Sequence, residues 1–118
     1  GYTAGRFPVT EVFELPFIAP NATAASQALW TFYERHATKE FETVKPLALH
    51  VHDNGQLHLR DKPIRQLADF RGMKLRAPTR QTSRLLARLG ATPVSMPVPQ
   101  VADALSKGVI DGAVVPWE

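Results

Sequence analysis

An arginine at the end of a short apolar strand is the residue of this sequence with the clearest chemical use. In "GMKLRAPTRQTSRLLARLGA", residues 72–91, the apolar run leads into Arg76, Pro78 breaks the strand, and Thr79 opens an amphipathic helix. A planar guanidinium suits bidentate carboxylate binding, and the free N–H groups of a helix N-terminus also favour an anion. Two interpretations stay open: Arg76 is an anion clamp at the mouth of an α/β cleft, or it is a surface charge in solvent.

A second basic feature follows on the predicted helix, where Arg80, Arg84 and Arg88 recur at a spacing of four residues. Residues 60–88 carry nine basic side chains against two acidic ones, a local net charge of +7 that favours an anionic partner. The stripe has no interleaved aromatic residues, so we interpret it as a solvated face and not as a nucleic-acid site.

Other chemistry finds less support. His50 and His52 share one face of an extended segment and His58 follows, but no fourth ligand accompanies them at a diagnostic spacing, so no metal site is predicted. The chain has no cysteine and none of the common nucleophile, phosphate-loop, dinucleotide or zinc-protease motifs, so we predict neither catalysis nor a cofactor.

Trp117 follows a proline at a strand end, where an indole can form a wall of a binding cleft.

The elements that must position these residues alternate along the chain. Asn21 is a good N-cap for a helix over residues 22–36, whose apolar residues recur at three- and four-residue spacings. Strands are expected at 44–51, 56–59, 73–76, 92–96 and 113–115, and further helices at 80–89 and 100–107. This alternation predicts an α/β fold with a mixed or parallel sheet flanked by helices, which binds ligands at the carboxyl ends of its strands.

Length and composition agree with an ordinary globular protein. The chain has 118 residues, of which 44% are hydrophobic and 21% charged, with a formal net charge of +3. No run of 18 apolar residues is present, so no membrane-spanning segment is predicted. The chain begins without methionine and stops after a strand-like run, which leads us to expect an internal piece of a longer protein.

Three stretches resemble the DctP-type solute-binding proteins of tripartite ATP-independent periplasmic (TRAP) transporters. They are "FPVTEVFELPF", "GQLHLRDKPIRQLADFRG" and "GMKLRAPTRQTSRLLARLGATPVSMPVPQVADALSKGVIDGAVVPWE", and together they cover most of the chain. The resemblance implies a truncated lobe of the type II periplasmic-binding-protein fold. It also implies a periplasmic, non-catalytic receptor that closes on a small organic acid and hands it to TRAP permease subunits.

The resemblance also assigns roles to residues. The family's arginine in the "K-[LI]-R-x-P" strand end binds the substrate carboxylate, and the match here is Arg76 in "KLRAP". Gln56 stands where some members carry a second arginine, and Val115 where some carry an asparagine, which favours an apolar wall. The predicted ligand-binding residues are Arg76, Gln56, His58, Pro78, Val115, Pro116, Trp117 and Glu118, with Phe13 and Glu14 as further candidates.

The expected organisation is two partial lobes joined by crossing strands. Residues 1–43 are assigned to the first lobe, 44–55 to a hinge or crossover strand, 56–112 to the second lobe, and 113–118 to a hinge strand that leads back. A truncated lobe exposes apolar surface, so we expect self-association, as a dimer that exchanges strands or as a simple dimer. The alternative function is a basic α/β regulatory or nucleic-acid-binding domain.

Overall fold

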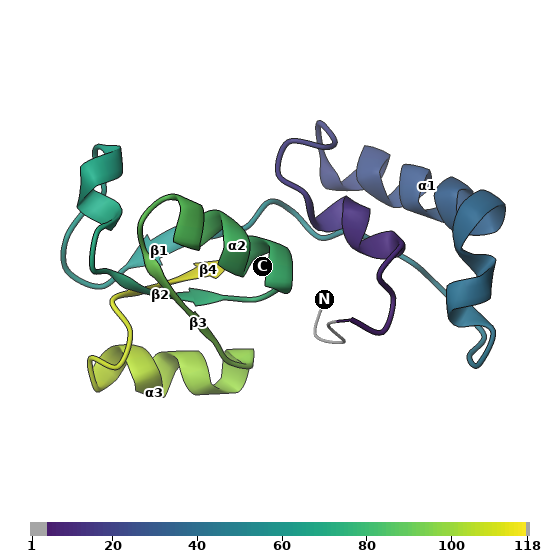
Figure 1. The fold of residues 1–118 in the computed structure, drawn as a ribbon. Coiled ribbons are helices and arrows are strands. Elements are labelled where there is room, and N and C mark those ends of the chain that lie inside the picture. The colour runs from purple at the N-terminus through teal and green to yellow at the C-terminus, as the bar shows by residue number, and fades with distance from the viewer. Residues whose placement is uncertain (1–4, 118) are drawn as a thin grey trace. The chain divides into compact units, whose positions relative to one another are not determined.

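The computed structural model describes residues 5–117, and these divide into two compact units, 5–54 and 55–117. Each unit is described by itself. The first is helical and the second holds the sheet (Figure 1).

The first unit is built around α1 (Ala22–Phe32). The Asn21 side chain caps this helix by accepting a hydrogen bond of 2.8 Å from the Ala24 N–H, as its sequence position predicts. The chain continues through a π-helical turn at Tyr33–Ala37 and a 3₁₀ turn at Thr38–Phe41. The predicted helix over 22–36 is therefore confirmed, with its last turn widened.

The strand predicted at 44–51 is wrong, because the structure describes this segment as irregular. Pro46 has no N–H to give to a ladder. The Val51 N–H donates to the Ser26 hydroxyl at 2.9 Å, and the Val51 carbonyl accepts from the same hydroxyl at 3.3 Å. The backbone groups of Val51 thus pair with a side chain of α1 instead of with a neighbouring strand.

The second unit is a four-stranded sheet of β1 (Gln56–Leu59), β4 (Gly112–Val115), β2 (Lys74–Ala77) and β3 (Thr92–Ser95), in that spatial order. β1 is antiparallel to β4, whereas β4, β2 and β3 run parallel. This confirms the predicted mixed α/β sheet, and four of the five predicted strands are present within a residue or two of their expected bounds.

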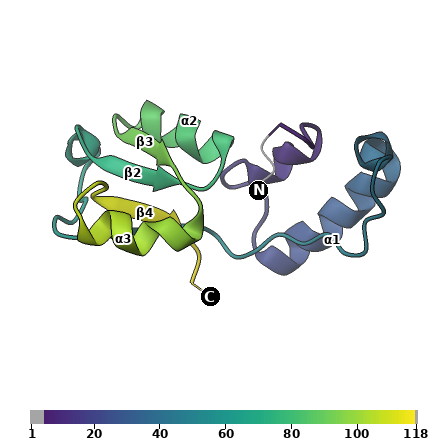
Figure 2. The same cartoon turned by 90° about the horizontal axis from the view of Figure 1, so that it is seen from below.

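Two helices cover the sheet, α2 (Arg80–Arg88) and α3 (Val101–Ser106), and they lie on opposite sides of it (Figures 1 and 2). Leu86 of α2 packs with Leu75 and Ala77. Ala104 of α3 packs with Ala113 on the other face. Successive residues of β2 therefore face different helices, as the period of two in a strand requires.

Candidate functional site

Arg76 is buried, with 1% of its surface exposed, and this rules out the solvent-exposed interpretation. Its Nε donates to the Met96 carbonyl at 3.0 Å, and its Nη1 donates to the Val114 carbonyl at 2.9 Å. Its Nη2 is buried and has no hydrogen-bond partner among residues 5–117. An unpaired buried polar group costs about 1–3 kcal/mol, and more when it is charged. The guanidinium is therefore held in place by two nitrogens and retains binding capacity on the third.

The place of Arg76 in the sheet matches the position where open α/β sheets bind ligands. β2 runs into α2 on one face, and β3 runs through a short 3₁₀ turn into α3 on the other face. Adjacent parallel strands whose connections leave toward opposite faces open a crevice at their carboxyl ends. Arg76 spans this point, because its own strand is β2 and its Nε contact is Met96, the residue directly after β3.

The strand register sets four side chains in one row across the sheet. His58 is paired with Ala113, Ala113 with Arg76, and Arg76 with Val94. Residues opposite each other in neighbouring strands project to the same face, which here is the face covered by α3. Only a methyl group, that of Ala113, separates the strand positions of the histidine and the arginine.

His58 makes two contacts with the segment that follows β4. Its Nε2 lies 3.1 Å from the Val115 carbonyl oxygen, and its ring meets the Trp117 indole at a centroid distance of 4.5 Å and an interplanar angle of 80°. A carbonyl oxygen can only accept, so Nε2 is the protonated nitrogen. Trp117 itself is 75% exposed. The histidine therefore links the end of β1 to an exposed aromatic side chain.

The remaining predicted residues of the second unit lie near these two anchors. Gln56 is paired with Val115 and shares the face of His58. Val115 is half-buried against the core beneath α3. Pro78, also half-buried, directly follows β2. Pro116 connects Val115 to Trp117.

Three predicted residues are not among the described residues of the second unit. Phe13 and Glu14 belong to the first unit, where Phe13 packs edge-on against the Phe32 ring at 5.5 Å. Glu118 lies outside the described residues.

The described residues hold no group of three His, Cys, Asp or Glu side chains arranged to bind a metal ion. His52, one of the three histidines near the predicted turn, places its Nδ1 2.6 Å from the Asp53 carbonyl oxygen.

Sequence reasoning missed the backbone acceptors that orient Arg76, namely the carbonyls of Met96 and Val114. Every residue has a carbonyl, so no residue type announces them, and the strand register that brings them to Arg76 is a long-range property. The "TPVSM" run before Pro97 and the "GAVV" run identify the two strands but not their pairing with the strand of Arg76.

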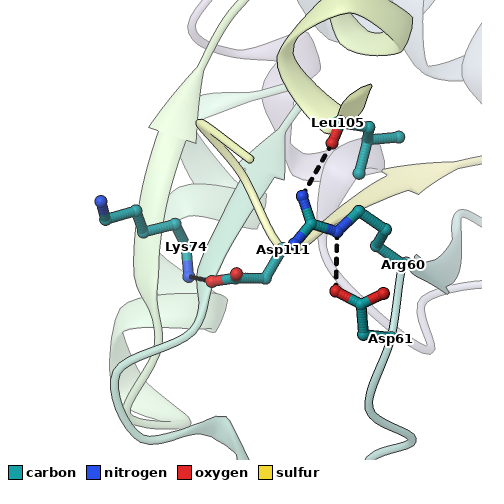
Figure 3. Close-up of polar contacts among 5 residues, drawn as sticks. All are labelled: Arg60, Asp61, Lys74, Leu105 and Asp111. Carbon is teal, nitrogen blue, oxygen red and sulfur yellow. Dashed lines mark hydrogen bonds and ion pairs between the residues drawn. The ribbon is translucent and has the colours of Figure 1, made fainter. Parts of the chain in front are cut away.

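A polar cluster at the other end of β2 holds that register (Figure 3). The Asp111 carboxylate accepts from the Lys74 backbone N–H at 2.7 Å, and the Asp111 N–H donates to the Lys74 carbonyl at 2.7 Å. Arg60 donates through Nη1 to the Leu105 carbonyl at 3.1 Å and through Nε to Asp61 at 2.7 Å (Figure 3). Asp111 thus ties the start of β4 to β2, and this connection sets where Val114 meets Arg76.

The second unit is thus an α/β unit with a buried arginine at the switch point of its sheet, and comparison with known proteins identifies the family. The family model "bacterial extracellular solute-binding protein, family 7", known as DctP, matches residues 1–118. The chain therefore belongs to the DctP family.

Several solved structures are similar over the whole chain. A TRAP solute-binding protein from Rhodoferax ferrireducens T118, in complex with copurified benzoate, is 55% identical with a TM-score of 0.95, covering 100% of this chain and 37% of that one. A marine metagenome protein specific for aromatic acid ligands, with 3-hydroxybenzoate, is 54% identical with a TM-score of 0.94 and the same coverage. A Bordetella bronchiseptica protein with bound (R)- and (S)-mandelate is 34% identical, with a TM-score of 0.87 over 98% of this chain and 37% of that one.

Among curated proteins, the outer membrane transporter protein TsaT of Comamonas testosteroni is 28% identical over 97% of this chain and 34% of its own length. The chain thus spans about a third of the length of the relatives that it matches. No helix among the described residues has the length and apolar character needed to cross a membrane.

Proposed function

We propose that this chain is part of an extracytoplasmic solute receptor that binds a small organic acid and delivers it to the membrane permease of a TRAP transporter. The observation that carries the proposal is the Arg76 guanidinium, which is buried at the switch point of the sheet, anchored by two carbonyls and unpaired at Nη2. A carboxylate is the natural partner for such a group, because ionised acceptors make the strongest hydrogen bonds to arginine.

Arg76 orients the ligand but cannot supply all of the affinity. A charge-assisted hydrogen bond contributes about 1.5–3 kcal/mol, whereas micromolar binding needs about 8 kcal/mol. Apolar contacts and closure of a second lobe over the ligand supply the rest. Because Nη2 is buried, the groups that cover this nitrogen must move before a carboxylate can bind to it. Such a movement is compatible with a receptor that opens and closes.

We propose an aromatic monocarboxylate as the ligand class. Two relatives at 54–55% identity carry benzoate or 3-hydroxybenzoate, and the second is described as specific for aromatic acids. Trp117 offers an exposed indole next to the site. Gln56 occupies the position where the family resemblance would place a second arginine for a dicarboxylate.

The proposed contacts of the acid are with Arg76 through its carboxylate and with a surrounding wall. The wall is formed by Gln56, Pro78, Val115, Pro116 and Trp117, with His58 against the Trp117 indole; the candidates Glu118, which lies outside the described residues, and Phe13 and Glu14, which belong to the first unit, are kept in the proposal.

Several further features of the proposal follow from family membership. The receptor has a binding role without catalysis, works in the periplasm, and has the permease subunits as its partners. We further propose that residues 1–43 belong to the first lobe and residues 56–112 to the second, with 44–55 and 113–118 as hinge segments.

Self-association of the 118-residue chain is also proposed, because Phe17 is 101% exposed, Leu47 88% and Trp117 75%. Exposed side chains of this size lose about 1.5–3 kcal/mol each relative to burial, which favours a dimer. Light scattering should return twice the mass of the chain, and a monomer at millimolar concentration would refute this part.

Calorimetric titration of the complete gene product with benzoate tests the main proposal, with duplex DNA titrated in parallel. We expect micromolar benzoate binding and no DNA binding at physiological salt. A nucleic-acid-binding domain would show the reverse, with a DNA affinity that falls steeply as salt rises.

A further inference from the structure

His58 has a set of contacts that the carboxylate clamp does not use. It is half-buried in β1, and its protonated Nε2 donates to the Val115 carbonyl at 3.1 Å. Among the residues that the structure describes, the aromatic partner of Trp117 is this imidazole, with the two ring centroids 4.5 Å apart. The histidine thus meets both the end of β4 and the indole two residues beyond it.

The same short segment is held from its other side by the carboxylate-binding arginine. Arg76 Nη1 donates to the Val114 carbonyl, the neighbour of the carbonyl that His58 holds. Trp117 is three residues from Val114, a span of at most about 10 Å for extended chain. Pro116 lies between them and fixes its own φ, and it restricts the residue before it to extended conformations. The backbone that leads from the arginine anchor to the indole is therefore short and stiff.

The orientation of the Trp117 side chain depends on its own contacts. At 75% exposure it has little packing of its own, and the His58 ring is its aromatic contact among the described residues. An edge-to-face contact between aromatic rings prefers this perpendicular geometry. Binding to a wall that is already in place costs less ordering entropy than binding to a mobile one.

We propose that His58 is a positioning residue that sets ligand specificity: it holds Trp117 so that the indole packs on the ring of an aromatic acid whose carboxylate is on Arg76. This inference rests on the proposed function and adds a selection mechanism to it. His58 acts through Trp117, without a hydrogen bond of its own to the acid.

A matched pair of acids isolates the effect. Benzoate and cyclohexanecarboxylate have the same charge and similar size, but only benzoate has a flat aromatic face for the indole. In the complete gene product, His58→Leu should weaken benzoate binding roughly tenfold, the upper range for an aromatic contact. It should leave the affinity for cyclohexanecarboxylate within threefold. His50→Leu, the same change at an exposed histidine, should alter neither affinity.

A double-mutant cycle tests whether His58 acts through Trp117. Trp117→Leu should lower benzoate affinity by at least as much as His58→Leu, and the double variant should be no weaker than Trp117→Leu alone. Additive losses would overturn the inference, since they would mean that the two residues act independently. His58→Phe, which keeps the ring edge but not the hydrogen bond, should retain the preference for benzoate, and it provides the test if the leucine variant fails to fold.

The outcomes separate this inference from the function beneath it. Wild-type protein that binds neither acid would overturn the proposed function and the inference together. Wild-type binding of benzoate with unchanged selectivity in His58→Leu would overturn the inference alone. Equal loss of both acids in that variant would make His58 a merely structural residue and would overturn it as well.

Discussion

Replacing Arg76 by lysine separates the binding role of the guanidinium from its structural role. Alanine is the wrong choice, because it would leave the carbonyls of Met96 and Val114 without their donors and a cavity beneath α3. Lysine keeps the positive charge and most of the volume, but its single nitrogen cannot present donors at three fixed places, as the three nitrogens of the guanidinium do.

The size of the effect follows from the contacts. Two nitrogens of Arg76 are engaged with carbonyls and the third is free for a ligand. A lysine nitrogen must give up at least one of these directions, and each charge-assisted hydrogen bond contributes about 1.5–3 kcal/mol. If the ammonium stays on the Met96 and Val114 carbonyls, the ligand loses its hydrogen bond. The dissociation constant of the ligand should then rise by about ten- to hundredfold.

Titration calorimetry with benzoate on the complete gene product measures this loss. Thermal unfolding of the same samples reports whether the fold is kept. Arg84→Lys is the matched control, since Arg84 is exposed on α2 and its replacement should leave the affinity unchanged. Benzoate affinity of Arg76→Lys within threefold of the wild type would refute the assignment of Arg76.

Three further changes test other parts of the structure. The exposed arginine stripe on α2 should not bind the acid, so changing Arg80, Arg84 and Arg88 together to glutamine should leave benzoate affinity within threefold, and a tenfold loss at physiological salt would contradict this. Gly112→Ala should lower the free energy of unfolding by about 1–3 kcal/mol in denaturant titration, because a Cβ there would lie 2.6 Å from the His58 carbonyl oxygen. Gly55→Ala should lower the free energy of unfolding by less, because its Cβ would meet a movable Val114 methyl. Equal losses in the two variants would argue against the strand register. The backbone N–H groups of Arg65 and then Gln66 donate to the Asp69 carboxylate and lower its pKa. These hydrogen bonds therefore stabilise the fold above the ordinary carboxyl pKa, and the stabilisation is lost as pH falls through the lowered pKa. An NMR titration that finds the pKa of Asp69 at or above the ordinary carboxyl value would contradict the capping geometry.

Much of the second unit is predictable from sequence because its signals are local. Thr79 accepts from the Thr82 N–H at the start of α2, and Gly90, with φ of 97°, follows the end of that helix. The four short strands lie between such signals. Arg76 could be singled out for the same reason, since strand, breaker and helix start are adjacent in the chain.

The features that could not be predicted from the sequence depend on which strands pair with each other. Residues 44–51 have strand-like composition, but a strand needs a partner, and Val51 pairs with the Ser26 hydroxyl instead. The contact of His58 with Trp117 joins positions that are 59 residues apart through the antiparallel register of β1 and β4. Histidine in "QLHL" looks like an ordinary strand residue until that register is known.

The central claim is that Arg76 Nη2 binds the carboxylate of the ligand, and a crystal structure of the complete gene product with bound benzoate tests it most directly. The account predicts a carboxylate oxygen about 2.7–2.9 Å from Nη2, with Nε and Nη1 still on the carbonyls of Met96 and Val114. Benzoate bound elsewhere in the protein, with Nη2 of Arg76 still unpaired or bonded to another protein group, would contradict it.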